Sequence, residues 1–279
     1  MTDRLHDGLR RFARHRLALI GLVVLVALGL GAGFAPQVSP YEPDAIDPRN
    51  MLDGPSAEHW LGTDDIGRDV LSRLLHAGRV SLTLALGVAL LAMAMGMMLG
   101  ALAGFFRGWV DTVISTLIDT MLSIPVLALA MVASAFIELT TWRLIAILSL
   151  VSWPTIARIT RGQVLSISQW AFVEAAEVLG FSNGRILLRH ILPNTLTPII
   201  VAGSLLVAYA ILIESALSFL GFGLPPPTAT WGGMLNAAQP YYQDAPWLAI
   251  FPGLVITLAV ASINFVGEGL REAFNPRAD

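Results

Sequence analysis

Six long stretches of mostly apolar residues determine what this chain can fold into. They cover residues 17–35, 80–106, 112–137, 142–160, 195–224 and 245–267. An α-helix needs about 20 apolar residues to cross the hydrocarbon core of a bilayer, and a chain in lipid must satisfy its own backbone hydrogen bonds. The sequence therefore predicts an all-α integral membrane protein with six transmembrane helices.

The composition agrees with a membrane protein. Charged residues make up 13% of the chain and its mean hydropathy is +0.69, whereas soluble domains carry about 25% charged residues. The fourth stretch reaches a full span only if Arg143 and Arg158 extend their charged ends to the two membrane surfaces. The first stretch is not a cleaved signal peptide, because no small-residue cleavage site follows it.

The arginine residues predict the orientation, because cytoplasmic loops are enriched in basic residues. With a cytoplasmic N-terminus, twelve arginines lie inside, namely Arg4, Arg10, Arg11, Arg14, Arg16, Arg107, Arg158, Arg161, Arg185, Arg189, Arg271 and Arg277. Five lie outside, namely Arg49, Arg68, Arg73, Arg79 and Arg143. We therefore expect both termini in the cytoplasm, an arm at residues 1–16 and a transmembrane domain at residues 17–279.

The N-terminal arm, residues 1–16, has Leu5, Leu9 and Phe12 on one helical face and arginines elsewhere. One interpretation is an amphipathic helix on the inner leaflet of the membrane. A basic tail that only sets the orientation of the first span is an equal alternative.

The residue types that are missing exclude several functions. The chain has no Lys, so it cannot form the P-loop that holds nucleotide phosphates with a lysine. It has no Cys, and its five His residues lie outside the apolar stretches, so neither thiol chemistry nor a haem or zinc site in the membrane is expected. A membrane-embedded enzyme is therefore a poor interpretation. We expect no cofactor or metal bound by this chain, and the lipid bilayer rather than nucleic acid around it.

The outer segment, residues 36–79, begins Pro-rich and then predicts a surface helix from Asp64 to Gly78. Acidic residues in its first turn suit the helix dipole. Such a helix would lie along the outer membrane surface and lead into the second span. It is either a packing element or a gate or docking element near a transport path, for which Arg68 and Asp69 are candidate residues.

The inner segment, residues 161–194, predicts two short helices that protrude into the cytoplasm. The first ends at Gly180, a residue that readily closes a helix in the left-handed conformation. Ser182 is a predicted N-cap for the second, which Pro193 is predicted to end. Glu174 offers a carboxylate to a partner, and Ala175 and Ala176 offer a flat surface, while Phe172, Val173 and Leu179 are predicted to supply apolar contacts without a core of their own.

The inner segment resembles the signature loop of binding-protein-dependent ABC importer permeases. The matching residues are Glu174, Ala175, Ala176, Gly180, Leu192 and Pro193, and Arg189 lies within the same loop. In that family the loop docks into a groove on a separate ATPase. The usual Ile before the x-Leu-Pro motif is His190 here, with Ile191 one place later, and this departure weakens the apolar anchor at that position.

Other segments are similar to the dipeptide/oligopeptide/nickel branch of that family, and to its C-type permease. They are residues 59–73, residues 217–227 with Trp231-Gly232, Phe251-Pro-Gly253, and residues 269–276. The resemblance implies a type I ABC importer permease in the bacterial inner membrane that forms half of a path for peptides. It also implies a second, homologous permease subunit in a heterodimer, two ATPase subunits that bind ATP and Mg, and an extracytoplasmic substrate-binding protein.

Two alternatives for the transport function stay open. The same machinery could import nickel or a metal chelate. More distantly, the chain could be a secondary transporter that needs no ATPase, which predicts an internal repeat and paired charges near the midplane. No clear repeat is found, and only Asp119 and Glu214 are candidate charges.

Asp119 and Glu214 each lie inside a predicted span. A charge at the bilayer centre costs about 2.5–3.5 kcal/mol on insertion scales, so each should face protein or water. For Asp119 we favour a structural ion pair or interhelical hydrogen bond over a role in the path. For Glu214 a path-lining role and a buried structural role are equal. Pro125 frees a backbone carbonyl and predicts that the third span can bend.

Overall fold

Long helices form where the sequence has its apolar stretches. The computed structural model describes residues 12–273. Within that range the regular secondary structure is helical, apart from an isolated β-bridge between Thr63 and Asp69. Five helices are long and apolar enough to cross a membrane: α2 (Arg16–Gly33), α4 (Val70–Phe106), α7 (Thr141–Ile167), α10 (Leu192–Phe219) and α12 (Trp247–Ala273). A bent pair, α5 (Gly108–Ser123) and α6 (Val126–Ala135), supplies a sixth span if it is counted as one.

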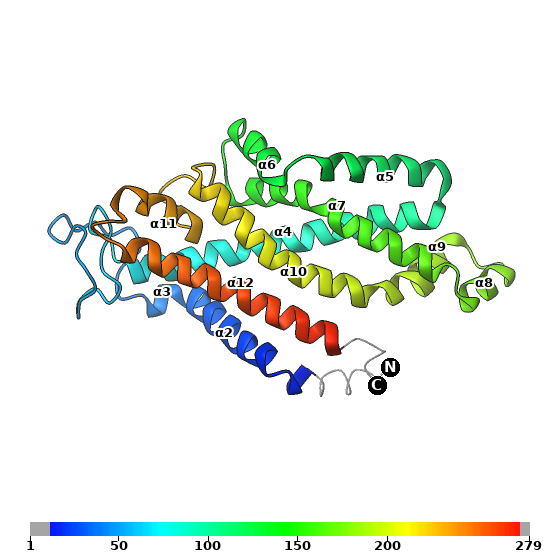
Figure 1. Ribbon diagram of the computed structural model, residues 1–279, viewed down its shortest axis with the longest axis horizontal. Coiled ribbons are helices and arrows are strands. Elements are labelled where there is room, and N and C mark those ends of the chain that lie inside the picture. The colour runs from blue at the N-terminus through cyan, green and yellow to red at the C-terminus, as the bar shows by residue number, and fades with distance from the viewer. Residues whose placement is uncertain (1–11, 274–279) are drawn as a thin grey trace.

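The long helices run along the long axis of the molecule, and the shorter elements gather at its two ends (Figure 1). Helix α11 (Trp231–Ala238), the short η2 (Gln239–Tyr241), α3 (Ala35–Val38) and the loop before α4 lie at one end. Helix α8 (Ala171–Val178) and α9 (Asn183–Arg185) lie at the other. The predicted outer and inner segments are therefore at opposite ends of the bundle.

The described ends of the chain point to one side. The start of α2 and the end of α12 both face the α8 end (Figure 1), and His15 Nε2 is 3.8 Å from Glu272 Oε2. An even number of crossings produces this arrangement. The predicted amphipathic arm lies almost entirely in residues 1–11, outside the described residues, as do the last residues of the motif at 269–276.

Small residues set the close approach of α4 and α7. A Cβ added to Gly96 would lie 2.7 Å from Ile156 Cβ, and one added to Gly104 would lie 2.8 Å from the Arg161 carbonyl oxygen. At Gly100, between them, the added atom would overlap the Ala157 carbonyl oxygen. Glycines spaced by four residues let two helix backbones meet in lipid, and Gly96, Gly100 and Gly104 provide this contact between α4 and α7.

The third predicted span, residues 112–137, is not one helix. Helices α5 and α6 are bent by 87° at Ile124 and Pro125. Proline lacks the N–H that would continue the ladder and drives the preceding residue toward extended backbone, and Ile124 has φ −93° and ψ 132°. The sequence predicted a bend at Pro125, and the structure shows a complete break.

The predicted surface helix from Asp64 to Gly78 does not start at Asp64 and is not separate from the second span. The helix begins at Val70 and runs without interruption to Phe106. Asp69 caps it, since the Ser72 N–H donates to the Asp69 carboxylate at 2.7 Å. Residues 64–69 form a turn in which Gly67 has φ +81° and packs directly on the Asp47 carbonyl, so no side chain with a Cβ fits there.

Pro193 does not end a helix, contrary to the prediction. It lies at the second residue of α10, directly after η1, and the helix continues past it to Phe219. Ser182 occupies the predicted N-cap position before α9 but makes no side-chain capping hydrogen bond. From Asn183 the chain stays helical through the π-helix η1 (Ile186–Ile191) into α10.

Candidate functional site

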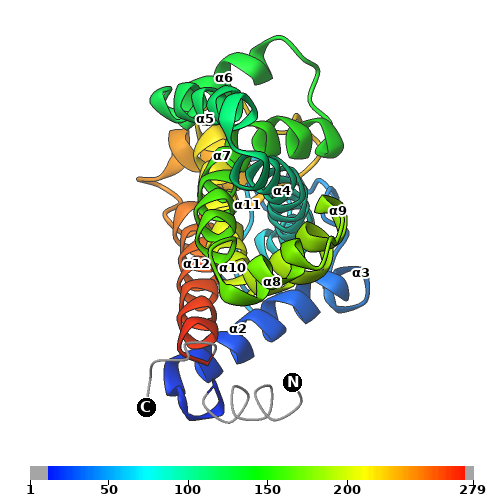
Figure 2. The same cartoon turned by 90° about the vertical axis from the view of Figure 1, so that its right-hand side faces the viewer.

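The inner segment forms a knob at the end of the bundle that faces the viewer in Figure 2. Helix α8, the turn after it, α9 and η1 make up this knob. Its apolar side chains pack on α4 and α7 in one small cluster: Ala101, Val164, Ile167, Val173, Ala176, Ile186, Leu187 and Ile191. The knob is therefore fixed to the membrane helices and does not hang from a loose loop.

This packing corrects two predictions about the knob. Val173 is fully buried in the cluster shared with α4 and α7, whereas Phe172 and Leu179 are exposed as predicted. Of the Ala175–Ala176 pair only Ala175 is exposed. The α-helical period puts residues 173 and 176 on the inner face and residues 174, 175 and 178 on the outer face.

Gly180 closes α8 in the conformation predicted for it. Its φ is +74°, the Gly180 N–H donates to the Glu177 carbonyl at 2.9 Å, and the Phe181 N–H donates to the Ala176 carbonyl at 3.1 Å. This pair of hydrogen bonds is the Schellman motif, in which the residue after the cap takes the left-handed conformation. The motif reverses the chain sharply and fixes the direction in which α8 points.

The outer face of α8 combines a carboxylate with apolar side chains. Glu174 is exposed and makes no ion pair among residues 12–273. Val178, one turn further along, is 88% exposed, and Leu179 is 72% exposed. Large apolar side chains this exposed, grouped at the water-facing end of a membrane protein, are typical of a protein-binding surface.

The second half of the knob accommodates His190 in place of an apolar anchor. The His190 ring stacks on Phe181 with 5.9 Å between centroids, and the Arg185 guanidinium lies 4.3 Å from the centre of the same ring. Ile191 is fully buried and takes the core position. A π-helical turn holds one residue more than an α-helical turn, and this matches the one-place shift from His190 to Ile191.

The remaining loop residues of the prediction lie around this second half. Arg189 and Pro193 are exposed, and Leu192 is partly buried against the knob cluster. Arg189 is thus available to a partner, while Leu192 holds the knob to α10.

Asp119 forms an ion pair, as the sequence analysis favoured. Its carboxylate lies 2.5 Å from the Arg158 guanidinium of α7. A second pair joins the same two helices, where Arg161 donates two hydrogen bonds to Asp111, at 2.5 and 2.7 Å. The sequence analysis did not single out Asp111, because it lies just outside the predicted span and carries no hydropathy signal there.

Glu214 is buried within the chain. It is 1% exposed, and the Ser218 hydroxyl donates to one of its carboxylate oxygens at 2.7 Å. The other oxygen has no hydrogen-bond partner among residues 12–273, and Glu214 is absent from the walls of both cavities described below. The geometry favours the structural interpretation over direct contact with a substrate.

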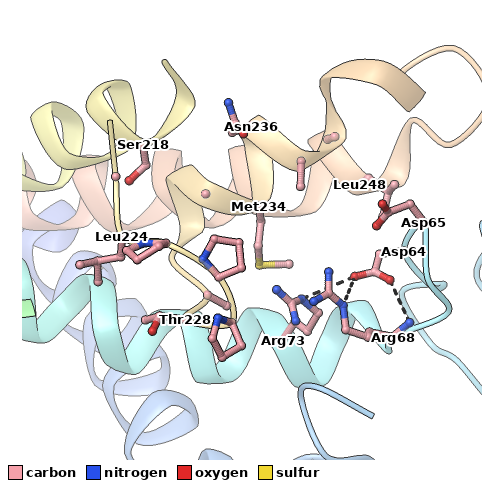
Figure 3. Close-up of a pocket in the computed structure, with 18 of the residues that line it drawn as sticks. Asp64, Asp65, Arg68, Arg73, Ser218, Leu224, Thr228, Met234, Asn236 and Leu248 are labelled. Carbon is pink, nitrogen blue, oxygen red and sulfur yellow. Dashed lines mark hydrogen bonds and ion pairs between the residues drawn. The ribbon is translucent and has the colours of Figure 1, made fainter. Parts of the chain in front are cut away.

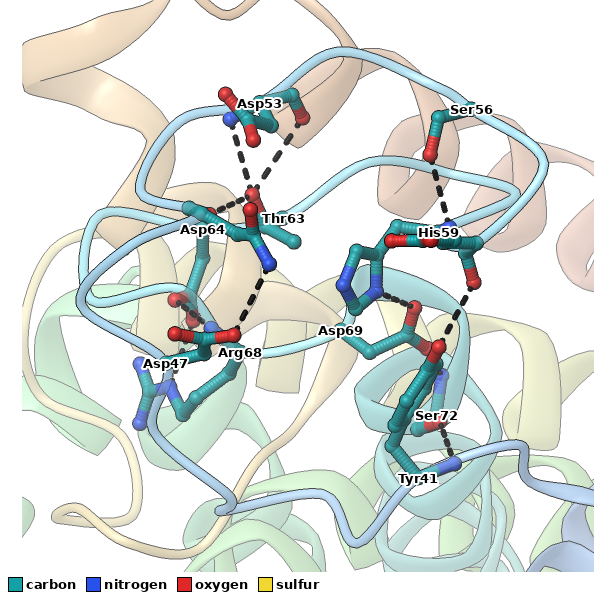
Figure 4. Close-up of polar contacts among 12 residues, drawn as sticks. Tyr41, Asp47, Asp53, Ser56, His59, Thr63, Asp64, Arg68, Asp69 and Ser72 are labelled. Carbon is teal, nitrogen blue, oxygen red and sulfur yellow. Dashed lines mark hydrogen bonds and ion pairs between the residues drawn. The ribbon is translucent and has the colours of Figure 1, made fainter.

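A network of charged side chains fixes the loop before α4 (Figure 4). Arg68 Nε donates to the Asp64 carboxylate at 2.7 Å, and Arg73 Nε lies 3.6 Å from the same carboxylate. The His59 ring contacts the Asp69 carboxylate at 2.9 Å, and the Asp69 side chain is 1% exposed. Asp69 therefore acts in the fold of the loop, while Arg68 reaches a cavity at the same end.

The larger cavity, of about 370 Å³, lies at the α11 end of the bundle, between the start of α4, the loop after α10 and α11 (Figure 3). Arg68 and Arg73 line one side, and prolines 225–227 with Met234 line the other. In Figure 3 the Asp64 carboxylate points toward the two guanidinium groups. The sequence analysis missed this cavity because its walls come from segments about 150 residues apart, and no local pattern records such contacts.

Two family models match the sequence. One is described as "Binding-protein-dependent transport system inner membrane component" and matches residues 96–279, which is more than half of the chain. The other is described as "N-terminal TM domain of oligopeptide transport permease C" and matches residues 4–55. The two matches lie at opposite ends of the chain and do not overlap.

Curated relatives match along almost the whole chain. A protein of Brucella suis with the provisional name of peptide permease protein is 40% identical over 280 residues, covering 100% of this chain and 93% of the relative. The dipeptide transport system permease protein DppC of Alkalihalophilus pseudofirmus is 38% identical over 271 residues, covering 97% and 89%. Another relative, of Brucella abortus, bears the provisional name of peptide transport system permease protein and is 40% identical over 268 residues, covering 96% and 90%.

Proposed function

Since this chain belongs to the family of binding-protein-dependent transport system inner membrane components, we propose that it is a peptide-conducting subunit whose α8 knob binds a separate ATPase. The family is one of multi-pass transport permeases of the bacterial inner membrane, with the type I permease fold. The finer assignments concern the coupling residues, the partners and the orientation.

The exposed outer face of α8 is the observation that carries the proposal. Glu174 offers an unpaired carboxylate beside Val178 and Leu179, which are among the most exposed apolar side chains of the described chain. The Schellman turn at Gly180 orients this face, and the knob cluster ties it to α4 and α7. A force applied to α8 would therefore reach the membrane helices through packed side chains.

The energy source of the transport cycle then lies on other chains. This chain has no Lys, and a P-loop requires one to reach the β- and γ-phosphates. ATP and Mg would bind to two partner ATPase subunits, and this chain would carry no bond chemistry. ATP-driven closure of the ATPases would draw two knobs together and open the path outward, and hydrolysis would return it inward.

The two-ended shape supports the rest of the proposal, which concerns the other partners and the orientation. The α8 end and both termini would be cytoplasmic, in agreement with the arginine distribution. The α11 end would face the extracytoplasmic binding protein. A second, homologous permease subunit would supply the other half of the path in a heterodimer.

Peptides are the substrates we propose. The relatives are named for peptide or dipeptide transport, and no observation on this chain favours nickel or a metal chelate. Selectivity would reside mostly in the binding protein that delivers the substrate.

A matched pair of substitutions tests the coupling role. Glu174→Ala removes the exposed carboxylate, and Glu177→Ala removes a second exposed carboxylate from the same helix. In the purified complex with its binding protein, Glu174→Ala should lower peptide-stimulated ATP hydrolysis at least tenfold, while Glu177→Ala should leave it within twofold. Both variants should insert and purify normally. Full coupled uptake by the Glu174→Ala complex would contradict the proposal.

A further inference from the structure

Helix α5 carries a stripe of exposed polar side chains on one face. At 3.6 residues per turn, the members of this stripe fall within about 100° of arc. They are Thr112, Thr116, Asp119, Thr120 and Ser123. The neighbouring arc is exposed as well, but apolar, with Val113 and Leu117. The helix thus presents two chemically different surfaces side by side.

The charged pair decides what can lie against the stripe. Threonine hydroxyls tolerate lipid when they donate to a carbonyl of the preceding turn, as Thr112 and Thr120 do. Asp119 and Arg158 do not have this option, and their side chains are 68% and 57% exposed despite their pairing. Charges facing hydrocarbon are costly, and those within spans almost always face the protein interior or water. Asp119 lies about 16 Å along α5 from Gly108, within the third apolar stretch, residues 112–137.

The two ion pairs between α5 and α7 differ in access. The Asp111 and Arg161 side chains are 20% and 33% exposed, so that pair is largely enclosed. The Asp119–Arg158 pair is open and borders a cavity of about 190 Å³, whose wall also includes Ser115, Ile118 and Arg161. The cavity is therefore lined by both members of the Asp119–Arg158 pair, but only by the arginine of the Asp111–Arg161 pair.

We propose that water lines the α5 stripe and that Asp119 and Arg158 form a subsite for the charged termini of a passing peptide. The proposal rests on the proposed function, since it takes peptides as the transported substrates. A zwitterionic peptide carries a carboxylate for the Arg158 guanidinium and an ammonium for the Asp119 carboxylate. The peptide carboxylate takes the place of Asp119 at the Arg158 guanidinium, and the peptide ammonium takes the place of Arg158 at the Asp119 carboxylate. An exposed ion pair is weak, so the exchange is easy in both directions and the peptide can leave.

The absence of cysteine from this chain makes the first test clean. Single cysteines are placed at Thr116 and Thr120 in the stripe, and at Val113 and Leu117 in the apolar arc. In the assembled complex in lipid nanodiscs, a membrane-impermeant thiol reagent should modify the two stripe positions at least tenfold faster than the two apolar ones. Slow modification at all four positions would place the stripe against lipid or another subunit and overturn the proposal.

Protection by peptide tests the subsite itself. Without binding protein, millimolar dialanine should slow the modification of Thr120→Cys at least threefold. N-acetyl-dialanine amide, which has no charged terminus, should not. Adding Asp119→Asn should abolish the protection, and adding Asp111→Asn, in the enclosed pair, should preserve it. Equal protection by both peptides, or by neither, would contradict the subsite.

Uptake measured in parallel separates this inference from the proposed function. A cysteine-free complex that takes up no peptide with its binding protein and ATP contradicts the proposed function. Normal uptake of dialanine without protection of Thr120→Cys contradicts the subsite alone.

Discussion

Replacing Gly180 with Ala should loosen the α8 knob without touching any neighbour. Gly180 has φ +74°, and a Cβ added there meets no atom within 4 Å. The penalty is therefore purely conformational. The left-handed region costs an L-residue about 1–2 kcal/mol. The lower entropy of Ala in a disordered turn offsets part of this cost, but the net effect at a positive φ is destabilising.

The expected loss appears in the affinity for the ATPase. If docking requires the native turn and the free knob relaxes, 1–2 kcal/mol raises the Kd for the ATPase subunit by up to about 5–30-fold. The assay titrates purified ATPase onto the permease complex in nanodiscs. Gly180→Asn should lose less than Gly180→Ala, because Asn tolerates the left-handed region better than Ala does.

Gly184→Ala is the matched control for this series. Gly184 lies four residues further along the same knob, its φ is not positive, and an added Cβ also meets no atom within 4 Å. We expect its Kd to stay within twofold of the unmodified protein. An equal Kd for Gly180→Ala and Gly184→Ala, or a larger loss of affinity for Gly180→Asn than for Gly180→Ala, would show that the left-handed turn at Gly180 does not control docking.

Four further substitutions test the packing of the bundle and the charges within it. Gly100→Ala places a Cβ on the Ala157 carbonyl and should destabilise the permease by about 1–3 kcal/mol. Gly162→Ala, whose added Cβ meets no atom within 4 Å, should stabilise it by about 0.5–1 kcal/mol. Thermal unfolding in detergent measures both effects, and the opposite ranking of the two variants would be inconsistent with the close approach of α4 and α7. Asp69→Ala removes the cap of α4 and should lower stability by about 0.5–2 kcal/mol in the same assay, and an unchanged unfolding temperature would speak against the cap. Glu214→Gln keeps the shape of a buried side chain that lines no described cavity, so peptide uptake and its KM should stay within twofold, and a large rise in KM would restore the substrate-contact interpretation.

Much of the fold could be predicted from hydropathy and glycine spacing, because both reflect the lipid environment directly. The helices follow the apolar stretches, and the glycines of α4 pack where their spacing predicts. Gly180 closes α8 because only local backbone geometry decides that turn. These features depend on short segments, which a sequence pattern can record.

The errors occurred where contacts between distant segments decide the structure. The start of α4 depends on Gly67 packing against Asp47, so the acidic residues at 64 and 65 gave a misleading helix signal. Ala176 is buried because the knob folds back on α4 and α7. Pro125 predicts a bend in the third span, but a single proline does not predict a break of 87° between α5 and α6.

Identifying the protein that contacts the α8 face is the most direct test of the proposed coupling to an ATPase. In a complex reconstituted with its ATPase subunits, a cysteine at Ala175, which is exposed on α8, carries a short photoactivated cross-linker. A cysteine at Trp60, 65% exposed at the opposite end, carries the same group as a control. We predict cross-linking of position 175 to the ATPase and none from position 60. Cross-links from position 175 that reach only lipid or the other permease subunit would contradict it.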